Sequence, residues 1–213
     1  MSRAGALLLG TVLLATPARA QDLRRGPDST YGRIDGDLGL EAAAGAVLGG
    51  EKPRLGVDLR ARYLSSGGVF ASYEEGGLVS SRAAPARVIA AGLELRPLFI
   101  GRWLTGYQLG QARWDLTLDS LGVEFGAVFV APRGGSLGAE PGAQAGVVVG
   151  MPLGATAHGP WVRLRGGLRL TPEGLSGARD AAGSPSHAYV AFEFAFQTFV
   201  SAGIVDAGDR ATP

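Results

Sequence analysis

The ten residues WVRLRGGLRL, at positions 161–170, alternate between cationic and apolar side chains. Arg163, Arg165 and Arg169 share one parity, and the large apolar residues at 162, 164, 168 and 170 share the other. Successive side chains of a β-strand point to opposite faces, so a period of two predicts a strand with one charged face and one apolar face. The direction in which each face points decides the class of the fold.

The same period extends over most of the chain. The segments expected to form strands are 33–48, 54–64, 87–97, 114–119, 121–130, 143–153, 161–170 and 187–200. Residues 69–75 either continue the strand before them or form one of their own, and a change of parity near Ser120 predicts a bulge or a bend. Residues 99–113 break the pattern, because their large apolar side chains recur at spacings of three and four, which favours a short helix.

The connections predict how the chain is organised. GGEKP at 49–53 and GATAHGP at 154–160 are typical of turns, whereas 76–86, 131–142 and 171–186 are longer, polar, glycine-rich loops. We find neither a repeat of 20–50 residues nor a linker between two domains. The expected organisation is a signal peptide over 1–20, one β-domain over 21–200 and a flexible tail over 201–213.

The polar face carries acidic and basic residues in similar numbers, and the opposite face is almost free of charge. Two architectures fit this division. In a soluble sandwich or calycin-like barrel, the apolar face is the core and the charges meet water. In an outer-membrane barrel, the apolar face meets lipid and the charges fill the lumen. The residues expected to form ion pairs in such a lumen are Arg33, Asp35, Asp37, Glu41, Asp58, Arg60, Arg62, Glu94, Arg96, Asp115, Asp119, Glu124, Arg163, Arg165, Arg169 and Glu193.

Three observations favour the membrane barrel. The expected strands at 33–48, 54–64 and 161–170 reach the roughly nine to eleven residues that a tilted membrane-spanning strand needs. Glycine and alanine alternate with charges on the polar face, as a crowded narrow lumen requires. Aromatic residues near strand ends suit girdles at the two membrane interfaces. These residues are Tyr31, Tyr63, Phe70, Trp114, Trp161 and Tyr189.

The sequence therefore predicts an all-β, antiparallel, up-and-down barrel of eight strands. Its length excludes a 16-stranded porin. A buried arginine needs a partner, so strand adjacency predicts pairs of Arg163 with Glu193 and of Arg60 with Asp35 or Asp37. A filled lumen of nearly balanced charge is not expected to conduct ions.

The N-terminus has the three parts of a secretory signal peptide: a basic start, an apolar stretch, and an A-x-A cleavage site before Gln21. We expect Sec-dependent export and cleavage near Ala20. Removal of Arg3 and Arg19 with the signal leaves 18 basic and 19 acidic residues, a balance that gives no electrostatic argument for nucleic-acid binding. The chain contains no cysteine, so disulfides are excluded and the sheet has to be stabilised by closure or by its core.

The signal peptide, the alternating strands and the mixture of short and long connections resemble small Gram-negative outer-membrane β-barrels. The stretch LELRPLFIGRWLTGYQLGQARWDLTLDSLGVEFG, at 93–126, resembles a segment of uncharacterised outer-membrane proteins of myxobacterial type. The resemblance implies an outer-membrane location, contact with membrane lipid and lipopolysaccharide, and a monomeric barrel. Many such barrels end in an aromatic residue, whereas here Phe196 or Phe199 would end the last strand and a tail follows to Pro213.

Candidate catalytic and metal sites are weak. Some small outer-membrane barrels modify lipid A with a His/Ser/Glu set, but Ser186 and His187 are adjacent in a strand and therefore point to opposite faces. The segment DLTLD at 115–119 carries two same-face carboxylates that could bind calcium, but it lacks an established calcium loop. We expect no enzyme activity, no cofactor and no metal site.

Three functions remain open at this point. The first is a structural or surface-interaction barrel of the outer membrane, with its function in the loops at 76–86, 131–142 and 171–186. The second is a soluble periplasmic, lipocalin-like barrel that binds an apolar ligand. The third is a lipid A-modifying enzyme of the outer membrane.

Overall fold

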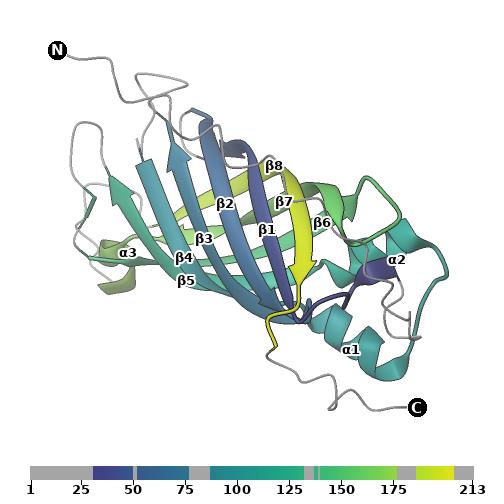
Figure 1. The fold of residues 1–213 in the computed structure, drawn as a ribbon. Helices are drawn as coiled ribbons and strands as arrows, with labels where there is room; N and C mark the ends of the chain where they lie inside the picture. The colour runs from purple at the N-terminus through teal and green to yellow at the C-terminus, as the bar shows by residue number, and fades with distance from the viewer. Residues whose placement is uncertain are drawn as a thin grey trace.

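The computed structural model describes residues 31–49, 52–76, 87–131, 137–138, 140–176 and 186–203. Within these ranges, eight antiparallel strands form a closed barrel, in which each strand pairs with the next and β8 pairs with β1 (Figure 1). The predicted eight-stranded antiparallel barrel is confirmed. The strands are β1 (Leu38–Leu48), β2 (Arg54–Tyr63), β3 (Gly67–Glu75), β4 (Arg87–Leu95), β5 (Gly122–Ala131), β6 (Gly142–Pro152), β7 (Gly159–Leu170) and β8 (Ser186–Val200).

The register of the strands makes the barrel narrow. Following paired residues once around the barrel from Leu38 of β1 leads back to β1 at Leu48, so the shear is ten residues. With eight strands, this shear corresponds to a strand tilt of about 45° and an interior just wide enough for side chains to fill. Side chains that point inward from distant strands therefore meet near the barrel axis.

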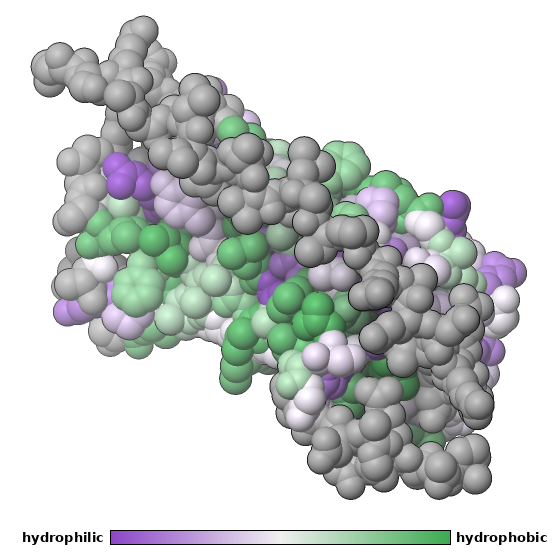
Figure 2. All heavy atoms as spheres, in the orientation of Figure 1, coloured by the Kyte–Doolittle hydropathy of each residue, from purple (hydrophilic) through white to green (hydrophobic). Residues whose placement is uncertain are grey.

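The polarity of the two faces of the barrel wall is the reverse of that in a soluble protein. Leu59 and Phe194 point outward and are 56% and 62% exposed, whereas the inward-pointing Arg62 and Glu193 are 1% and 0% exposed. Figure 2 shows hydrophobic residues over much of the barrel wall that faces the viewer. Buried and exposed residues alternate along almost the whole length of β2, and its large apolar residues are on the exposed side. Charged side chains therefore form much of the interior, and large apolar side chains form much of the exterior.

Close approach between strands explains part of the high glycine content. A Cβ added to Gly167 would lie 2.2 Å from the backbone oxygen of Ala145. The residue paired with Gly167 across β6 and β7 is also a glycine, Gly146. Gly92 and Gly126 form a similar pair between β4 and β5. Glycine at such places lets a sheet coil tightly enough to close into a small barrel.

Replacing Gly167 with alanine should destabilise the barrel by about 2–3 kcal/mol, because the new methyl group meets the backbone of β6 and the strands have to separate. The matched control is Gly166→Ala, where the nearest atom to the added Cβ is a backbone oxygen at 3.3 Å. Urea unfolding, followed by the loss of the compact gel form, measures both. Equal stability of the two variants would contradict this account of the close strand contact.

Two helices lie beyond one end of the barrel in the connection from β4 to β5, and a short third helix, α3 (Pro172–Ser176), follows β7 (Figure 1). α1 (Pro97–Thr105) begins with a proline, which suits the first turn, and ends before Gly106, whose φ of 64° is left-handed. α2 (Ala112–Asp119) packs against β6. The helix expected over 99–113 is therefore present as α1, which starts two residues earlier and stops well before 113.

The strand predicted over 114–119 is wrong, because these residues belong to α2. Asp115, Leu116 and Asp119 are the buried residues of this helix, and their spacing of one, three and four places them on one helical face. A window of six residues is too short to separate a period of two from a period of 3.6. The change of parity near Ser120 is the end of α2 and the start of β5, where we expected a bulge or a bend within a strand.

Two other boundaries differ from the prediction. β1 begins at Leu38, so the polar residues at 33, 35 and 37 precede the strand instead of alternating within it. Residues 69–75 belong to a separate strand, β3, because the chain reverses direction through a tight turn in which Leu64 and Ser65 have positive φ angles of 43° and 58°. The sequence carries no glycine at those two positions to announce the turn.

The expected aromatic girdle is only partly present. Tyr63 is exposed at the end of β2, and Trp114 is exposed on α2. Phe70, Trp161 and Tyr189 are instead buried. Parity decides these three, because each shares its strand face with the charged residues that point inward.

Several predictions concern residues outside the described ranges. These are the signal peptide at 1–20, parts of the loops at 76–86, 131–142 and 171–186, and the tail from 204 onward. Among the described residues, we find no helix that is both long and apolar enough to cross a bilayer.

Candidate functional site

The interior of the barrel contains one connected set of ion pairs. It is formed by inward-pointing residues of β1, β2, β4, β5, β7 and β8 and by the residue that follows β4. Within the described residues, this central network contains five arginines and five carboxylates, so its formal charge is zero. Its members are Glu41, Asp58, Arg60, Arg62, Glu94, Arg96, Glu124, Arg163, Arg165 and Glu193.

Arg60 is a centre of this network. Its Nε lies 2.7 Å from an oxygen of Asp58, its Nη1 lies 2.7 Å from Glu94, and its Nη2 lies 2.6 Å from Glu124. Glu94 and Glu124 are directly paired in the register of β4 and β5, where two like charges repel each other. The guanidinium of Arg60 lies between them and offsets this repulsion. Its side chain is fully excluded from solvent.

Arg163 is a second centre of the network. It donates hydrogen bonds to Glu41, to Asp58 at 2.7 Å and to Glu193 at 2.6 Å. Arg165 lies 3.2 Å from Asp58 and 3.2 Å from Glu193. Asp58 therefore contacts three arginines, including Arg60, and joins the two centres into one network.

The remaining members extend the network toward the end of the barrel that carries α1 and α2. Arg62 lies 2.9 Å from Glu41 and 3.0 Å from Glu94, and Arg96 lies 2.8 Å from Glu94. Isolated charges in such a dry interior would cost several kcal/mol each, and pairing within a hydrogen-bonded network offsets that cost. The network fills the middle of the barrel with fixed charged groups.

The two expected pairings have different outcomes. Arg163 and Glu193 are paired across β7 and β8, as strand adjacency predicted. Arg60 does not pair with Asp35 or Asp37, because both aspartates precede β1 and lie at the end of the barrel. Asp35 instead lies 3.3 Å from Nε2 of His158, and Asp37 accepts a hydrogen bond from the backbone N–H of Ala202. These contacts tie the start of β1 to neighbouring segments.

A second, smaller cluster lies at the opposite end of the barrel, which we call the loop end because the three glycine-rich loops at 76–86, 131–142 and 171–186 join strands there. Arg169 donates two hydrogen bonds to Glu74, and its Nε donates one to Gln144 at 2.8 Å. Arg54 donates to the same carboxylate from Nε at 2.9 Å. Glu74 was not among the expected lumenal residues because the segment around it looked irregular. Glu74 has the same parity as Phe70 and Ser72, and all three residues are buried in β3. This parity was the one indication that Glu74 points into the lumen.

A third cluster involves α1 and α2, at the end of the barrel where β1 begins and β8 ends. Arg102 of α1 pairs with Asp115 and, at 2.9 Å, with Asp119 of α2. Arg33 lies 2.7 Å from Asp119. The sequence placed Arg33, Asp115 and Asp119 on strands that point into the lumen. They are instead brought together by a helix pair and by the segment before β1.

The two aspartates of α2 have opposite electrostatic environments. Burial tends to raise the pKa of Asp115, but the N–H of Leu109 and the Arg102 guanidinium hold that pKa below its ordinary value. Burial raises the pKa of Asp119, although Arg33 and Arg102 both oppose the rise. Both carboxylates already have cationic partners, so they are poorly placed to share a calcium ion. Within the described ranges, no group of three or more metal-ligating side chains occurs.

Replacing Arg102 with glutamine should loosen the helix pair without unfolding the barrel. The change leaves Asp115 without its arginine, a loss of about 1–3 kcal/mol that falls on local opening. Hydrogen exchange should speed up by about tenfold or more at the amides of α1 and α2, with exchange in β7 and β8 unchanged. The control is Arg113→Gln, which removes one exposed hydrogen bond to Leu153. Equal acceleration in β7 and β8 would contradict a local role for Arg102.

The residues of the possible lipid A-modifying site do not come together. Ser186, His187 and Glu193 all lie on β8. Glu193 is paired with Arg163 and Arg165, and it lies six residue steps from His187, about 20 Å along an extended strand. A hydrolase would need its histidine within hydrogen-bond distance of both the hydroxyl and the carboxylate. The described geometry does not supply that arrangement.

Comparisons with known proteins find similar solved structures but nothing more. No protein-family model matches the chain, and neither does any curated protein. Neisserial surface protein A is 11% identical, with 76% of this chain and 96% of that chain covered and a TM-score of 0.40. Ail, the attachment invasion locus protein of Yersinia pestis, solved with the heparin analogue sucrose octasulfate, is 7% identical, with the same coverage and a TM-score of 0.31. The resemblance of residues 93–126 to myxobacterial-type proteins stays a prediction.

Proposed function

We propose that this chain is an integral β-barrel of the bacterial outer membrane with a structural or surface-interaction role. The observation that carries the proposal is the reversed distribution of polarity around the barrel wall. Large apolar side chains point outward from all eight described strands, and the ionised side chains of the central network point inward. Lipid is the environment in which such an exterior is stable.

The outer apolar surface is too extensive for a soluble monomer. On β8 alone, Val190, Phe192, Phe194 and Phe196 are all exposed, each with half or nearly half of its surface open. Soluble monomers rarely expose contiguous apolar patches of more than a few hundred Å². A soluble barrel that binds an apolar ligand would need an apolar interior, whereas the interior described here is filled by ion pairs. The lipocalin-like alternative is therefore not supported.

The connections favour one orientation in the membrane. β1 begins and β8 ends at the same end of the barrel, close to α1 and α2 (Figure 1). In outer-membrane barrels, longer loops face the cell exterior and shorter turns face the periplasm. The longest connection, 96–121, lies at the helical end, but three of the four connections at the loop end are long and two of the three at the helical end are short. We therefore place the loop end outside, so that the loops at 76–86, 131–142 and 171–186 carry the surface interactions. The two helices then lie on the periplasmic side.

The proposal includes a closed lumen and a monomeric barrel surrounded by lipid and lipopolysaccharide. The central network leaves charged groups fixed across the middle of the barrel, so the protein would serve as a scaffold for its loops and not as an open pore. Neither of the two proteins compared above contributes to this argument, since their TM-scores are below one half. Sec export with cleavage after Ala20 belongs to the same proposal, and N-terminal sequencing of the mature protein tests it.

Cell fractionation followed by gel electrophoresis tests the proposed location. We expect the mature chain in the outer-membrane fraction, released only by detergent, with a compact unheated form that migrates differently from the heated form. Salt or carbonate washing should leave it in the membrane. Recovery of the folded chain from the periplasm without detergent would overturn the proposal.

A further inference from the structure

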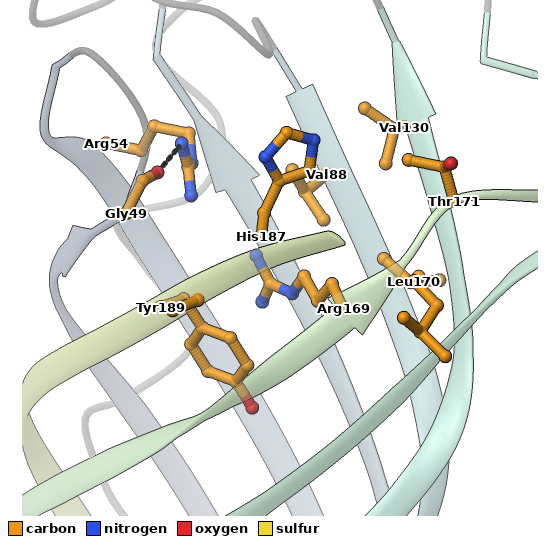
Figure 3. Close-up of a pocket in the computed structure, with 11 residues that line it drawn as sticks. Gly49, Arg54, Val88, Val130, Arg169, Leu170, Thr171, His187 and Tyr189 are labelled. Atoms are coloured by element: carbon orange, nitrogen blue, oxygen red, sulfur yellow. Dashed lines mark hydrogen bonds between the residues drawn. The ribbon is translucent and has the colours of Figure 1, made fainter. Parts of the chain in front are cut away.

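A small cavity of about 20 Å³ lies at the loop end of the barrel. Figure 3 shows Arg54 with its hydrogen bond to Gly49, together with Arg169 of β7 and His187 of β8. Arg169 and His187 are paired in the register of these two strands. The other polar side chains of the lining are Thr171 and Tyr189. None of the ion pairs of the central network uses Arg54 or Arg169.

The charges around this cavity do not balance within the described residues. Arg54 and Arg169 are 2% and 4% exposed, and among the described residues the fully buried Glu74 is the one carboxylate that both contact. The central network is neutral and contributes no counter-charge, so Arg54, Arg169 and Glu74 together leave one positive charge in excess at this cavity. A buried excess charge is costly unless a counter-charge is close.

The donors that remain point to the kind of ligand that fits. A guanidinium has five N–H donors. Arg54 uses Nε for Glu74 and Nη1 for Gly49, and no hydrogen bond from its Nη2 occurs to any described residue. The His187 ring and the Thr171 hydroxyl, which also line the cavity, add further polar groups that can donate. Arginine forks with hydroxyl and imidazole donors are suited to an oxyanion such as phosphate.

We infer that the loop end of this barrel contains an oxyanion-binding site, formed by Arg54, Arg169, His187 and Thr171, that accepts a phosphate group. The cavity has room for about one water-sized group, so a single phosphate oxygen enters and the rest of the group stays at the mouth. The phosphate could be free in solution or belong to lipopolysaccharide at the outer leaflet. The first possibility is independent of the membrane proposal, and the second depends on it.

Calorimetric titration of inorganic phosphate into the folded barrel in neutral detergent, at constant chloride, tests the site. We expect saturable binding to the unmodified chain. Arg169→Gln should weaken it by about tenfold or more, since a charge-assisted hydrogen bond is lost, and the balanced pair of Arg54 with Glu74 should keep the variant folded. Glu74→Gln should tighten binding by about tenfold, because phosphate then replaces the carboxylate between two arginines.

The matched control is Arg87→Gln. Arg87 lies at the same end of the barrel, is half-exposed, and has a loose contact of 3.5 Å with Glu75. The Arg87→Gln variant loses the same charge as Arg169→Gln, but outside the cavity. Its affinity for phosphate should therefore stay within about twofold of that of the unmodified chain. Three results would each overturn the site. The first is an equal loss of phosphate affinity in Arg87→Gln and Arg169→Gln. The others are displacement of phosphate by the same concentration of chloride, and no gain of phosphate affinity in Glu74→Gln.

A competition arm distinguishes the two sources of phosphate. If lipopolysaccharide supplies the group, then adding it to the micelles displaces inorganic phosphate, and chemically dephosphorylated lipopolysaccharide does not. If the ligand is free phosphate, neither form of lipopolysaccharide changes the titration. Both outcomes support a phosphate site. Absence of phosphate binding by a barrel that still fractionates with the outer membrane would reject the site alone and leave the proposed function standing.

Discussion

Arg60→Met is expected to lower the free energy of unfolding by about 3–5 kcal/mol, the cost of breaking a buried ion pair by removing one partner. Methionine keeps much of the side-chain volume but removes the charge. Glu94 and Glu124 would then face each other across β4 and β5 without the cation that lies 2.7 and 2.6 Å from them. Asp58 would keep its contacts with Arg163 and Arg165, so the largest loss falls on the two glutamates.

Urea titration of the barrel in lipid vesicles, followed by the fraction of compact gel form, measures this loss. Arg87→Met is the control, because its half-exposed pair with Glu75 should contribute no more than about 1 kcal/mol. In a double-mutant cycle, Glu124→Gln should recover part of the loss caused by Arg60→Met, since Arg60 is the one cation within 3 Å of Glu124 among the described residues. Simple additivity of the two changes would contradict the proposed link between these residues.

Phe194→Arg should destabilise the barrel by about 2–4 kcal/mol in a bilayer, the cost of placing arginine on the lipid face near the midplane. Phe194 points outward, is 62% exposed, and is paired with Ala44 near the middle of β1 and with Val162 of β7. In a soluble barrel the same change would expose a charge to water and cost almost nothing. The size of the effect therefore reports on the environment of the outer wall.

Val200→Arg is the matched control for depth. Val200 also points outward, but it is the last residue of β8 and lies where the strand leaves the apolar band. The expected cost there is about 0–1 kcal/mol. Both variants are compared with the unmodified chain by urea unfolding in vesicles of one lipid composition. A loss at Phe194 no larger than the loss at Val200 would contradict a lipid-facing wall.

The strands of the barrel could be predicted from the sequence because the two faces of each strand meet very different surroundings. Arg163, Leu164 and Arg165 illustrate this point, since two paired charges alternate with a half-exposed leucine on a single strand. No compact fold other than a sheet separates such residues cleanly. The period of two therefore survives even where glycines and alanines weaken the contrast.

The partners within the network could not be predicted in the same way. Arg60 meets Glu94 and Glu124 because the shear of the closed barrel brings β2, β4 and β5 to one level near the axis. A sequence indicates which strands are neighbours but not the relative shift of strands across the barrel. Arg163 and Glu193 were predictable because they lie on consecutive strands and at paired positions.

The second helix of this connection, α2, escaped prediction for a local reason. Asp115 and Asp119 fit both a strand face and a helix face over so short a segment, and only their partners decide between the two. Arg102 favours the helix, because it lies on the preceding helix, α1, and pairs with both aspartates. The contact is tertiary, and no periodicity within residues 114–119 contains it.

Nuclear Overhauser contacts between valine methyl groups and lipid chains would test the central claim, that the apolar face of this barrel meets lipid. Val147 and Val148 are adjacent on β6, yet the first is 55% exposed and the second is 1% exposed. In lipid nanodiscs we predict cross-peaks from the methyl groups of Val147 to the acyl chains and none from those of Val148. Contact of Val147 with water and no contact with lipid would contradict the claim.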